Sequence, residues 1–581
     1  MSKLSIDQKT IEGLFSDKKT DFLVPDYQRP YAWEEKECQQ LWDDIFSFAF
    51  PDDDYEKFNS DDEYYLGTIV TFKNENIKKL EVIDGQQRLT TLMLLLRAFY
   101  SKFGNMKDKN SISTRETIGK CLWKGNEFGE IDMNILKIDS QVATDNDKDE
   151  FLEILRTGEV GDKMKSKYAK NYLFFVVQIA DFLQNYPSFF PYLPNRILKN
   201  CILLPIEAES QDTALRIFST LNNRGLPLSD ADIFKSEFYK KFSKLNRKDE
   251  FIERWRKLEQ NCNQYFNPQF GTPMDELFTR YMYYERAKMN ITKSTTEALR
   301  SFYSKDNYKL LNEDTMRNLE ILMDFWRDVY DQSEERFSAD ILRQLFILEY
   351  APNGMWTYFL SVYFMKNKDA KNMLDNDKLY AFLKKTIAFV WTYAITNPGV
   401  NALRTPLYKE MHNIVGGGLV EFKDAKFDEE KTKNMMENYS YLNGRPITKS
   451  MLVWWSMNIE GQDIPSISTR FEIEHIYARN RNDKENQLVK SGNVELLGNK
   501  AILEKRINIR ASDYKFEDKK KYYLGYTNKR NEVKDATVNK ELKDFANDKS
   551  RTDFTEKDII SRTTDILEKF FSYIREENLF A

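Results

Sequence analysis

Residues 241–412 limit the possible folds of this chain more than any other segment. Hydrophobic residues recur there at three- and four-residue intervals, as in FIERWRKLEQ, DELFTRYMYYERA and KLYAFLKKTIAFVWTYAI. This spacing is typical of amphipathic helices. Glycine and proline are scarce, with 21 and 15 copies among 581 residues, which favours long helices over loop-rich sheets. We therefore expect a multidomain, predominantly α-helical protein with smaller α+β parts.

The length of the chain requires more than one hydrophobic core. Residues 1–240 alternate helical segments with strand-like ones such as YYLGTIVTF, KKLEVID and CILLPIEA. Residues 241–412 are the helical connection, and the glycine-rich NIVGGGLVEF leads into residues 413–581, with a functional core at 465–530. We expect three domains. The long apolar helices of the middle part suit either an internal core or a homodimer.

Cysteine spacing and the lengths of the apolar stretches indicate the compartment. The four cysteines are widely scattered and form no CxxC pair, which argues against a disulfide framework and favours a reducing compartment. The most apolar stretches, LTTLMLLL and YLFFVVQIADFL, are too short to cross a bilayer. We expect a cytoplasmic protein that does not bind membranes.

The segment KKLEVIDGQQRLTTLMLLLRAFY joins a short buried strand to a helix with a broad apolar face. The turn between them consists of Asp84, Gly85, Gln86, Gln87 and Arg88. Helix N-termini attract phosphates through unpaired N–H groups and a partial positive charge. Arginine and glutamine add donors, glycine permits close backbone approach, and the aspartate is suited to orient a metal or a ribose. A polar helix cap without a ligand is the alternative interpretation.

Two further segments favour an anion site in this half of the chain. VPDYQRPYAW places Tyr27, Gln28 and Arg29 together, a combination suited to stacking on a base and holding a phosphate. IFSTLNNRGLPLSDADIFKSE contributes Asn222, Arg224 and Lys235 as further contacts to the same anion. In this segment, Ser229 and Asp232 predict a capping box at the start of a helix. An ordinary aromatic edge of the core would explain the first segment equally well.

One of only two histidines in the chain, His475, lies in RFEIEHIYARN. The alternation of FEIEHI predicts a short strand with one buried face. Asn499 follows 24 residues later in a turn before the strand-like KAILE, and Asn508 lies nine residues beyond it. A hairpin would bring Asn499 beside His475, and Asn508 near Glu474. Without these neighbours, a buried structural histidine would be the better interpretation.

The region around His475 is basic although the whole chain carries a net charge of −5. Residues 471–530 contain 14 Lys and Arg against 9 Asp and Glu. A polyanion would be attracted to this region. A predicted basic helix adds Lys519, Lys520 and Lys521 to this region.

The N-terminal blocks PDYQRPYAW, LGTIV, VIDGQQRLTTL and IFSTLNNRGLPLSDADIFKSE closely resemble the N-terminal domain of GmrSD-type modification-dependent (type IV) restriction enzymes. They occur in family order over about the first 240 residues. The resemblance implies a ParB/sulfiredoxin-like fold that binds and hydrolyses a nucleoside triphosphate.

The C-terminal blocks IEHIYAR, LLGNKAIL, and RIN with FEDKKKYY resemble the HNH, or ββα-metal, nuclease motif fused to that domain. The resemblance implies that His475 is the general base, Glu474 a metal ligand and Asn499 the residue that positions the base. Asn508 takes the place of the final histidine and completes the catalytic set as a metal ligand. An amide suits a hard cation such as Mg²⁺ or Mn²⁺. Lys519 matches the lysine expected in the following helix, and the resemblance implies that Lys519 and Lys520 contact DNA phosphate. A proline common after the first block is replaced here by Tyr477-Ala478-Arg479.

Together, the two halves predict a nucleotide-regulated, metal-dependent DNA endonuclease and NTPase that restricts foreign phage DNA, with modified DNA as the expected target. A phosphorothioate-sensing DNA nickase of the same family is the nearest alternative. Two others belong to different classes: a nucleotide-dependent scaffold with an inactive nuclease domain, and a toxin-like nuclease.

Overall fold

The structure is a computed structural model of the 581-residue chain. It describes residues 5–581 apart from 7, 27, 75–77, 127–129, 143–144, 209–212, 215–228, 269–270, 297, 304–310, 400, 486–487 and 529. The chain divides into two compact units, Met1–Lys257 and Leu258–Ala581. The expected C-terminal part and the expected helical middle from Leu258 onward therefore belong to the second unit, whereas residues 241–257 belong to the first.

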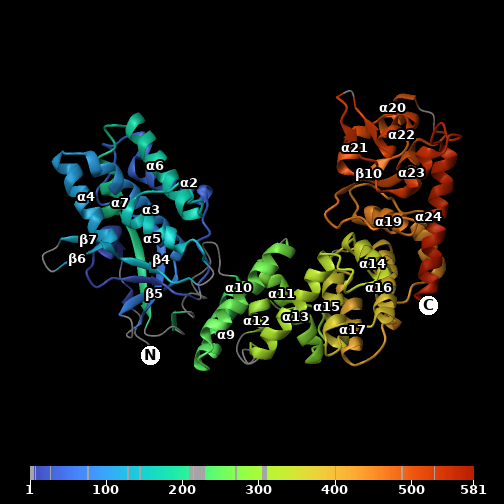
Figure 1. The fold of residues 1–581 in the computed structure, drawn as a ribbon, viewed down its shortest axis with the longest axis horizontal. Helices are drawn as coiled ribbons and strands as arrows, with labels where there is room; N and C mark the ends of the chain where they lie inside the picture. Colours follow the sequence, from blue (N-terminus) through green and yellow to red (C-terminus); the bar gives the residue numbers. More distant parts are fainter. Residues whose placement is uncertain are drawn as a thin grey trace. The chain divides into compact units, whose positions relative to one another are not determined.

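A mixed seven-stranded sheet organises the first unit (Figure 1). Its strands lie in the order β1-β9-β4-β5-β3-β8, with β2 also paired to β9. The pairs β3–β5, β3–β8 and β4–β9 are parallel, whereas β4–β5 is antiparallel. The strands of this sheet are β1 (Ser5–Ile6), β2 (Lys9–Thr10), β3 (Phe22–Val24), β4 (Tyr64–Asn74), β5 (Lys79–Asp84), β8 (Ile138–Ser140) and β9 (Cys201–Ala208). The three strands expected from the sequence are confirmed as β4, β5 and β9.

Helices pack against this sheet and enclose the principal core of the first unit. That core includes Ile69 and Val82 from the sheet and nearly the whole length of α3. The described helices are α1 (Ile11–Phe15), α2 (Glu35–Ala49), α3 (Gln86–Lys102), α4 (Lys109–Leu122), α5 (Lys148–Thr157), α6 (Lys167–Asn185), α7 (Tyr192–Asn200), α9 (Asp230–Lys244) and α10 (Lys248–Tyr265). A separate hairpin joins β6 (Trp123–Gly125) to β7 (Ile131–Leu136).

The helical part of the second unit has well-defined helix starts. Thr272 and Asp275 form a capping box at α11, with a proline as the first helical residue, and such caps each contribute about 1 kcal/mol. α11 packs against α13, α15 and α17, while α16 packs against α14, α19 and α24. The described helices here are α11 (Pro273–Lys288), α12 (Leu299–Phe302), α13 (Glu313–Tyr330), α14 (Ala339–Glu349), α15 (Met355–Asn367), α16 (Asn376–Thr396) and α17 (Arg404–Val415), green to yellow in Figure 1.

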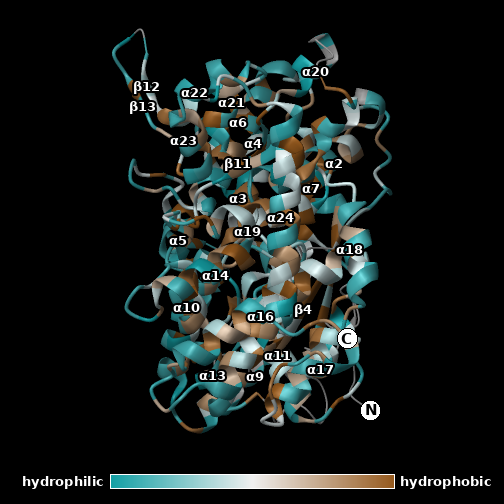
Figure 2. Ribbon diagram, turned by 90° about the vertical axis from the view of Figure 1, so that its right-hand side faces the viewer, coloured by the Kyte–Doolittle hydropathy of each residue, from teal (hydrophilic) through white to brown (hydrophobic). Residues whose placement is uncertain are grey.

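The C-terminal part of this unit surrounds a short antiparallel hairpin of β10 (Phe471–His475) and β11 (Lys500–Glu504). Buried residues of β11, α21, α22, α23 and α24 share one core. A second hairpin, β12 (Tyr526–Thr527) with β13 (Val533–Lys534), projects from this region and is mostly hydrophilic (Figure 2). The helices are α18 (Glu429–Glu437), α19 (Pro446–Met457), α20 (Arg479–Glu485), α21 (Lys505–Ala511), α22 (Phe516–Leu524), α23 (Lys540–Asn547) and α24 (Glu556–Glu576).

Two observations bear on the compartment expected from the sequence. All four cysteines are buried as free thiols. Among the described residues, no helix combines the length and apolar character needed to cross a membrane.

Candidate active site

The β10–β11 hairpin places the sequence-predicted residues next to one another. His475 pairs with Lys500 and Glu474 with Ala501 across the two strands. Phe471 anchors the start of β10 because its buried ring packs against helix α14 and Tyr350, which follows it. The hairpin expected around His475 and Asn499 is therefore present. β11 has the bounds of KAILE, whereas β10 ends at His475, one residue before the end of the predicted FEIEHI.

Asn499 fixes the chain immediately after His475. Its Oδ1 accepts a hydrogen bond from the Tyr477 N–H at 2.7 Å. Its Nδ2 donates to the carbonyl oxygens of Tyr477 at 3.0 Å and Val494 at 2.9 Å. Its own carbonyl accepts from the Ile476 N–H at 2.9 Å. Because the side chain is fully buried, every polar atom of the amide is used to hold this turn.

Glu474 points into the protein core from the strand position before His475. Lys519 Nζ lies 2.7 Å from Glu474 Oε1, and the Tyr523 hydroxyl donates to the same oxygen at 2.7 Å. Burial raises the pKa of the Glu474 carboxyl, and the charge and hydrogen bond of Lys519 partly oppose that rise. Lys519 also donates to the carbonyl oxygen of His475 at 2.6 Å. This lysine therefore holds the end of β10 in place.

The imidazole of His475 is largely buried, with a side-chain exposure of 10%. Its burial, followed by the positive charge of Lys500, lowers the pKa of His475 to about 4, while nearby Glu495 acts in the opposite direction. The ring is consequently neutral at physiological pH. A neutral imidazole has a nitrogen lone pair that can accept a proton.

A pocket of about 290 Å³ opens beside this ring. Glu474, His475, Asn508 and Lys519 all line it, so the pocket brings together four of the predicted residues. Asn508 lies on α21, and none of the described residues hydrogen-bonds its side-chain amide. The remaining lining residues are Ile473, Ala478, Arg479, Asn480, Ser512 and Asp513.

The far wall of this pocket contains two residues that the sequence analysis missed. The Asn480 amide hydrogen-bonds the Asp513 carboxylate and lowers its pKa. Between α21 and Asp513, Ser512 has a φ of 43°, a left-handed conformation that non-glycine residues seldom adopt. Such strain is often found at functional sites. The motif blocks gave no signal for these residues because Asn480 and Asp513 lie outside IEHIYAR, LLGNKAIL, RIN and FEDKKKYY.

The lysines predicted to contact DNA do not occupy suitable positions. Lys519 is fully buried in its ion pair with Glu474. Lys520 pairs with Glu517 at 2.8 Å and keeps only 11% of its side chain exposed. This part of the prediction is corrected, because neither ammonium group faces outward. Arg479 at the pocket and the α21 cations Lys505, Arg506 and Arg510 have exposed or half-exposed positions instead.

In the first unit, the predicted DGQQR turn connects β5 to α3. Gly85 is the N-cap of α3 with a φ of 87°, and a Cβ there would lie 3.0 Å from the Thr68 carbonyl oxygen. Arg88 donates to that same carbonyl at 3.1 Å and is half-buried. Burial raises the pKa of Asp84, opposed by the N–H of Gly85 and the charges of Arg88 and Arg29. Asp84, Arg88 and Arg29 therefore form one charged group at the helix start.

The glutamines of this turn hold the neighbouring chain segment. Gln87 Oε1 accepts from the Ala32 N–H at 2.6 Å, and its Nε2 donates to Pro30 O at 3.2 Å. Gln86 Nε2 donates to Arg29 O at 2.7 Å. Gln28 donates to the carbonyls of Val82 and Ile83. These hydrogen bonds connect the two predicted segments. They also engage the glutamine side chains with backbone atoms rather than leaving them for a ligand. The exception is the buried Gln86 Oε1, which has no partner among the described residues.

Three residues predicted for this site lie outside the described residues: Tyr27, Asn222 and Arg224. Lys235 is buried on α9. On the same helix, Tyr239 donates to Asp26 at 3.1 Å and packs against the sheet face that contains Ile83. The capping box predicted for the start of α9 is present at Ser229 and Asp232.

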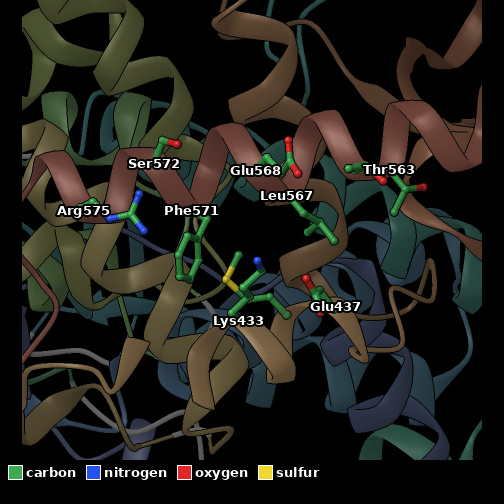
Figure 3. A pocket seen from close by; sticks show the side chains of 10 residues that line it. Lys433, Glu437, Thr563, Leu567, Glu568, Phe571, Ser572 and Arg575 are labelled. Carbon is green, nitrogen blue, oxygen red and sulfur yellow. The ribbon is translucent and has the colours of Figure 1, made fainter. Parts of the chain in front are cut away.

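A larger pocket of about 470 Å³ lies between α18 and α24 (Figure 3). Leu567 and Phe571 of α24 face Lys433 and Glu437 of α18 across it. It shares no residue with the hairpin pocket, although Thr563 at one end accepts a hydrogen bond from the Gly498 N–H at 2.9 Å. Its lining includes the carboxylates of Glu437 and Glu568 but none of the predicted catalytic residues, whereas four of those line the hairpin pocket, which is therefore the candidate active site.

Two family models match the chain. Residues 11–239 match the N-terminal domain of the GmrSD restriction endonuclease, and residues 423–569 match the C-terminal domain of GmrSD restriction endonucleases. No individually curated protein matches the chain. The two matches contain the DGQQR turn and the β10–β11 hairpin respectively, and together they span well over half of the sequence. The chain belongs to the GmrSD family of restriction endonucleases, which act on foreign DNA.

Proposed function

We propose that this restriction endonuclease hydrolyses DNA phosphodiester bonds at the β10–β11 pocket, as a ββα-metal (HNH) nuclease with His475 as general base. The observation that carries the proposal is a neutral, largely buried imidazole at the edge of a pocket lined by Glu474 and Asn508. A general base must be unprotonated at the working pH and must reach the attacking water. His475 then takes a proton from water as the water oxygen attacks phosphorus. The bond from phosphorus to the leaving sugar oxygen breaks, and that oxygen takes a proton from solvent water.

The pocket fits a hard divalent cation. Within the described residues, no three His, Cys, Asp or Glu side chains cluster as a metal site, so amide oxygens and water would complete the coordination. Mg²⁺ commonly keeps several waters and uses one or two carboxylates. Asn508 would hold such a cation together with Glu474 Oε2, since Glu474 Oε1 is bound by Lys519 and Tyr523, and Asp513 offers a second carboxylate. When bound, the cation supplies electrostatic stabilisation of the charge that develops on the phosphate.

Substrate DNA would contact cations that surround Asn508. Lys505, Arg506 and Arg510 lie on the same helix, α21, and Arg479 lines the pocket. Phosphate contacts by Lys and Arg dominate DNA affinity without reading sequence. We propose these four residues in place of Lys519 and Lys520.

We assign nucleotide binding and hydrolysis to the DGQQR turn, where α3 begins after Gly85 beside Arg88 and Arg29. Helix starts with nearby arginines bind phosphates. Nucleotide occupancy would license cleavage, since an ungated nuclease endangers the DNA of its own cell. Foreign DNA with modified bases is the proposed target.

This function is tested in cells and on the purified protein. Cells that express the wild type should resist phages whose DNA contains glucosylated or hydroxymethylated cytosine more than phages with plain cytosine. His475→Ala should abolish that resistance while leaving nucleotide hydrolysis intact. Arg88→Ala should lose nucleotide hydrolysis but keep DNA binding. Full resistance in His475→Ala cells would contradict the nuclease assignment, and unchanged hydrolysis in Arg88→Ala would contradict the assignment of the turn. A parallel test in a phosphorothioating host distinguishes the alternative of a phosphorothioate-sensing nickase.

A further inference from the structure

Glu495 lies beside the proposed general base, although no sequence motif singles it out. It is the last residue of the short 3-10 helix Ser491–Glu495. Its Oε2 is 3.7 Å from His475 Nε2, and 23% of its side chain is exposed. It precedes Asn499 by four residues, so one short segment supplies both the carboxylate that faces the ring and the amide that fixes the following turn.

Glu495 is itself held by two cations. Lys500 Nζ lies 2.8 Å from Glu495 Oε2, and Arg479 lies 2.5 Å from Oε1. The Lys500 side chain is fully buried, and its ammonium group also donates to the Tyr441 carbonyl at 2.6 Å. Because Lys500 pairs with His475 across the hairpin, the carboxylate, the ammonium group and the imidazole occupy one fixed corner of the hairpin.

This corner distinguishes the two nitrogens of the imidazole. Nε2 is buried, faces Glu495, and has no hydrogen-bond partner within 3.5 Å among the described residues. The 3.7 Å separation is slightly longer than a hydrogen bond. Catalytic hydrogen bonds are often long in a free enzyme and shorten in the substrate complex. A carboxylate at Nε2 favours a proton on that nitrogen, which leaves the Nδ1 lone pair as the proton acceptor.

We propose that Glu495 is a positioning residue, which orients the His475 ring and keeps the proton on Nε2 so that Nδ1 accepts the proton of the attacking water. The inference rests on the proposed function of His475. Its two cation partners largely neutralise the charge of Glu495, so its main contribution is orientation of the ring rather than added negative charge. In the reaction, an O–H bond of water breaks, an Nδ1–H bond forms, and the carboxylate accepts a hydrogen bond from Nε2–H.

The first experiment compares Glu495→Gln, Glu495→Asp and the control Glu472→Gln in single-turnover DNA cleavage with Mg²⁺ or Mn²⁺. Glu472 is an exposed acid on the same strand as His475, so its substitution removes the same charge without touching the ring. Glu495→Gln should reduce the cleavage rate by roughly 10- to 100-fold at unchanged DNA affinity, the size expected for a misplaced reacting group. Glu495→Asp should restore part of the rate, and Glu472→Gln should match the wild type.

The second experiment determines the tautomer of the His475 ring by NMR. Its main measurement is made on the wild type and so does not depend on the folding of a Glu495 variant. The chain has only two histidines, so ¹⁵N-histidine labelling gives two sets of ring signals, and His475→Ala assigns them. The wild type should show His475 with the proton on Nε2, and Glu495→Gln should shift the population of the two tautomers or broaden these signals. Glu472→Gln should leave them unchanged.

Two results would overturn the proposal. One is wild-type cleavage together with unchanged His475 ring signals in Glu495→Gln. The other is a wild-type His475 with its proton on Nδ1. Failure of the proposed function is recognised separately, because cleavage would then survive His475→Ala, whereas an error limited to Glu495 leaves His475→Ala inactive.

Discussion

Replacing Asn499 with alanine should unfold the catalytic hairpin rather than simply slow the reaction. The substitution removes three side-chain hydrogen bonds, one from the Tyr477 N–H and two to the carbonyls of Tyr477 and Val494. A net loss of about 1 kcal/mol for each bond gives about 3 kcal/mol, and the buried backbone groups left without partners add to that figure. Asn499→Asp should be no better, because a carboxylate oxygen would face two carbonyl oxygens in place of the amide donor.

Thermal unfolding measured by circular dichroism tests this estimate, with Asn508→Ala as the matched control. About 3 kcal/mol corresponds to a fall in melting temperature of roughly 4–5 °C for a transition of the size of the second unit. Asn508 is half-buried, and no described residue hydrogen-bonds its amide, so its substitution should abolish cleavage while leaving the melting temperature unchanged. Wild-type melting of Asn499→Ala would refute the view that this amide holds the turn after His475.

Three further predictions concern pH and stability. Since the pKa of His475 is held at about 4 in the folded chain, against about 6.5 when unfolded, the unfolded state binds the proton first as pH falls. The free energy of unfolding should therefore fall by about 3 kcal/mol between pH 6.5 and pH 4 because of this one group. Melting curves should show a correspondingly smaller loss of stability over the same pH range in His475→Gln than in the wild type. Lys519→Met leaves the buried Glu474 carboxylate without its cation and should lower the free energy of unfolding by about 3–5 kcal/mol. Melting curves should show partial recovery in the double variant with Glu474→Gln, and no loss in the control Lys521→Met, whose side chain is exposed. Gly85→Ala places a residue with a Cβ at a backbone φ of 87° and should lower the free energy of unfolding by about 1–2 kcal/mol. The first unit should then melt at a lower temperature, and a wild-type melting curve would contradict the strained turn.

Much of the fold follows from local sequence patterns. The strands β9 and β11 begin and end with the strand-like segments CILLPIEA and KAILE, and β10 ends one residue before the end of FEIEHI. The helix after Gly85 begins at once, because the glycine permits the left-handed N-cap. The division into units was less predictable. α16 packs against both α14 and the C-terminal α24, and such long-range contacts leave no periodic signal in the sequence.

The residues of the candidate site could be predicted where the spacing of motifs along the sequence identifies them. They could not be predicted where their role depends on the direction in which a side chain points in the folded protein. The positions of His475, Asn499 and Asn508 could be read from three motif blocks. The direction of Lys519 could not, because a lysine in a basic helix gives no sign that a buried glutamate lies beneath it. Glu495 was missed for a similar reason, since only the folded hairpin places it against the imidazole.

The central claim is that His475 accepts the proton of the attacking water, and cleavage of purified DNA tests it most directly. Wild type and His475→Ala, shown to melt at the same temperature, are compared on the same DNA with nucleoside triphosphate and Mg²⁺ or Mn²⁺. We predict that the variant retains nucleotide hydrolysis but cuts DNA roughly 10²- to 10⁴-fold more slowly, the usual contribution of a general base, and that chelating the metal stops cleavage by the wild type. Cleavage by His475→Ala at the wild-type rate would contradict the account.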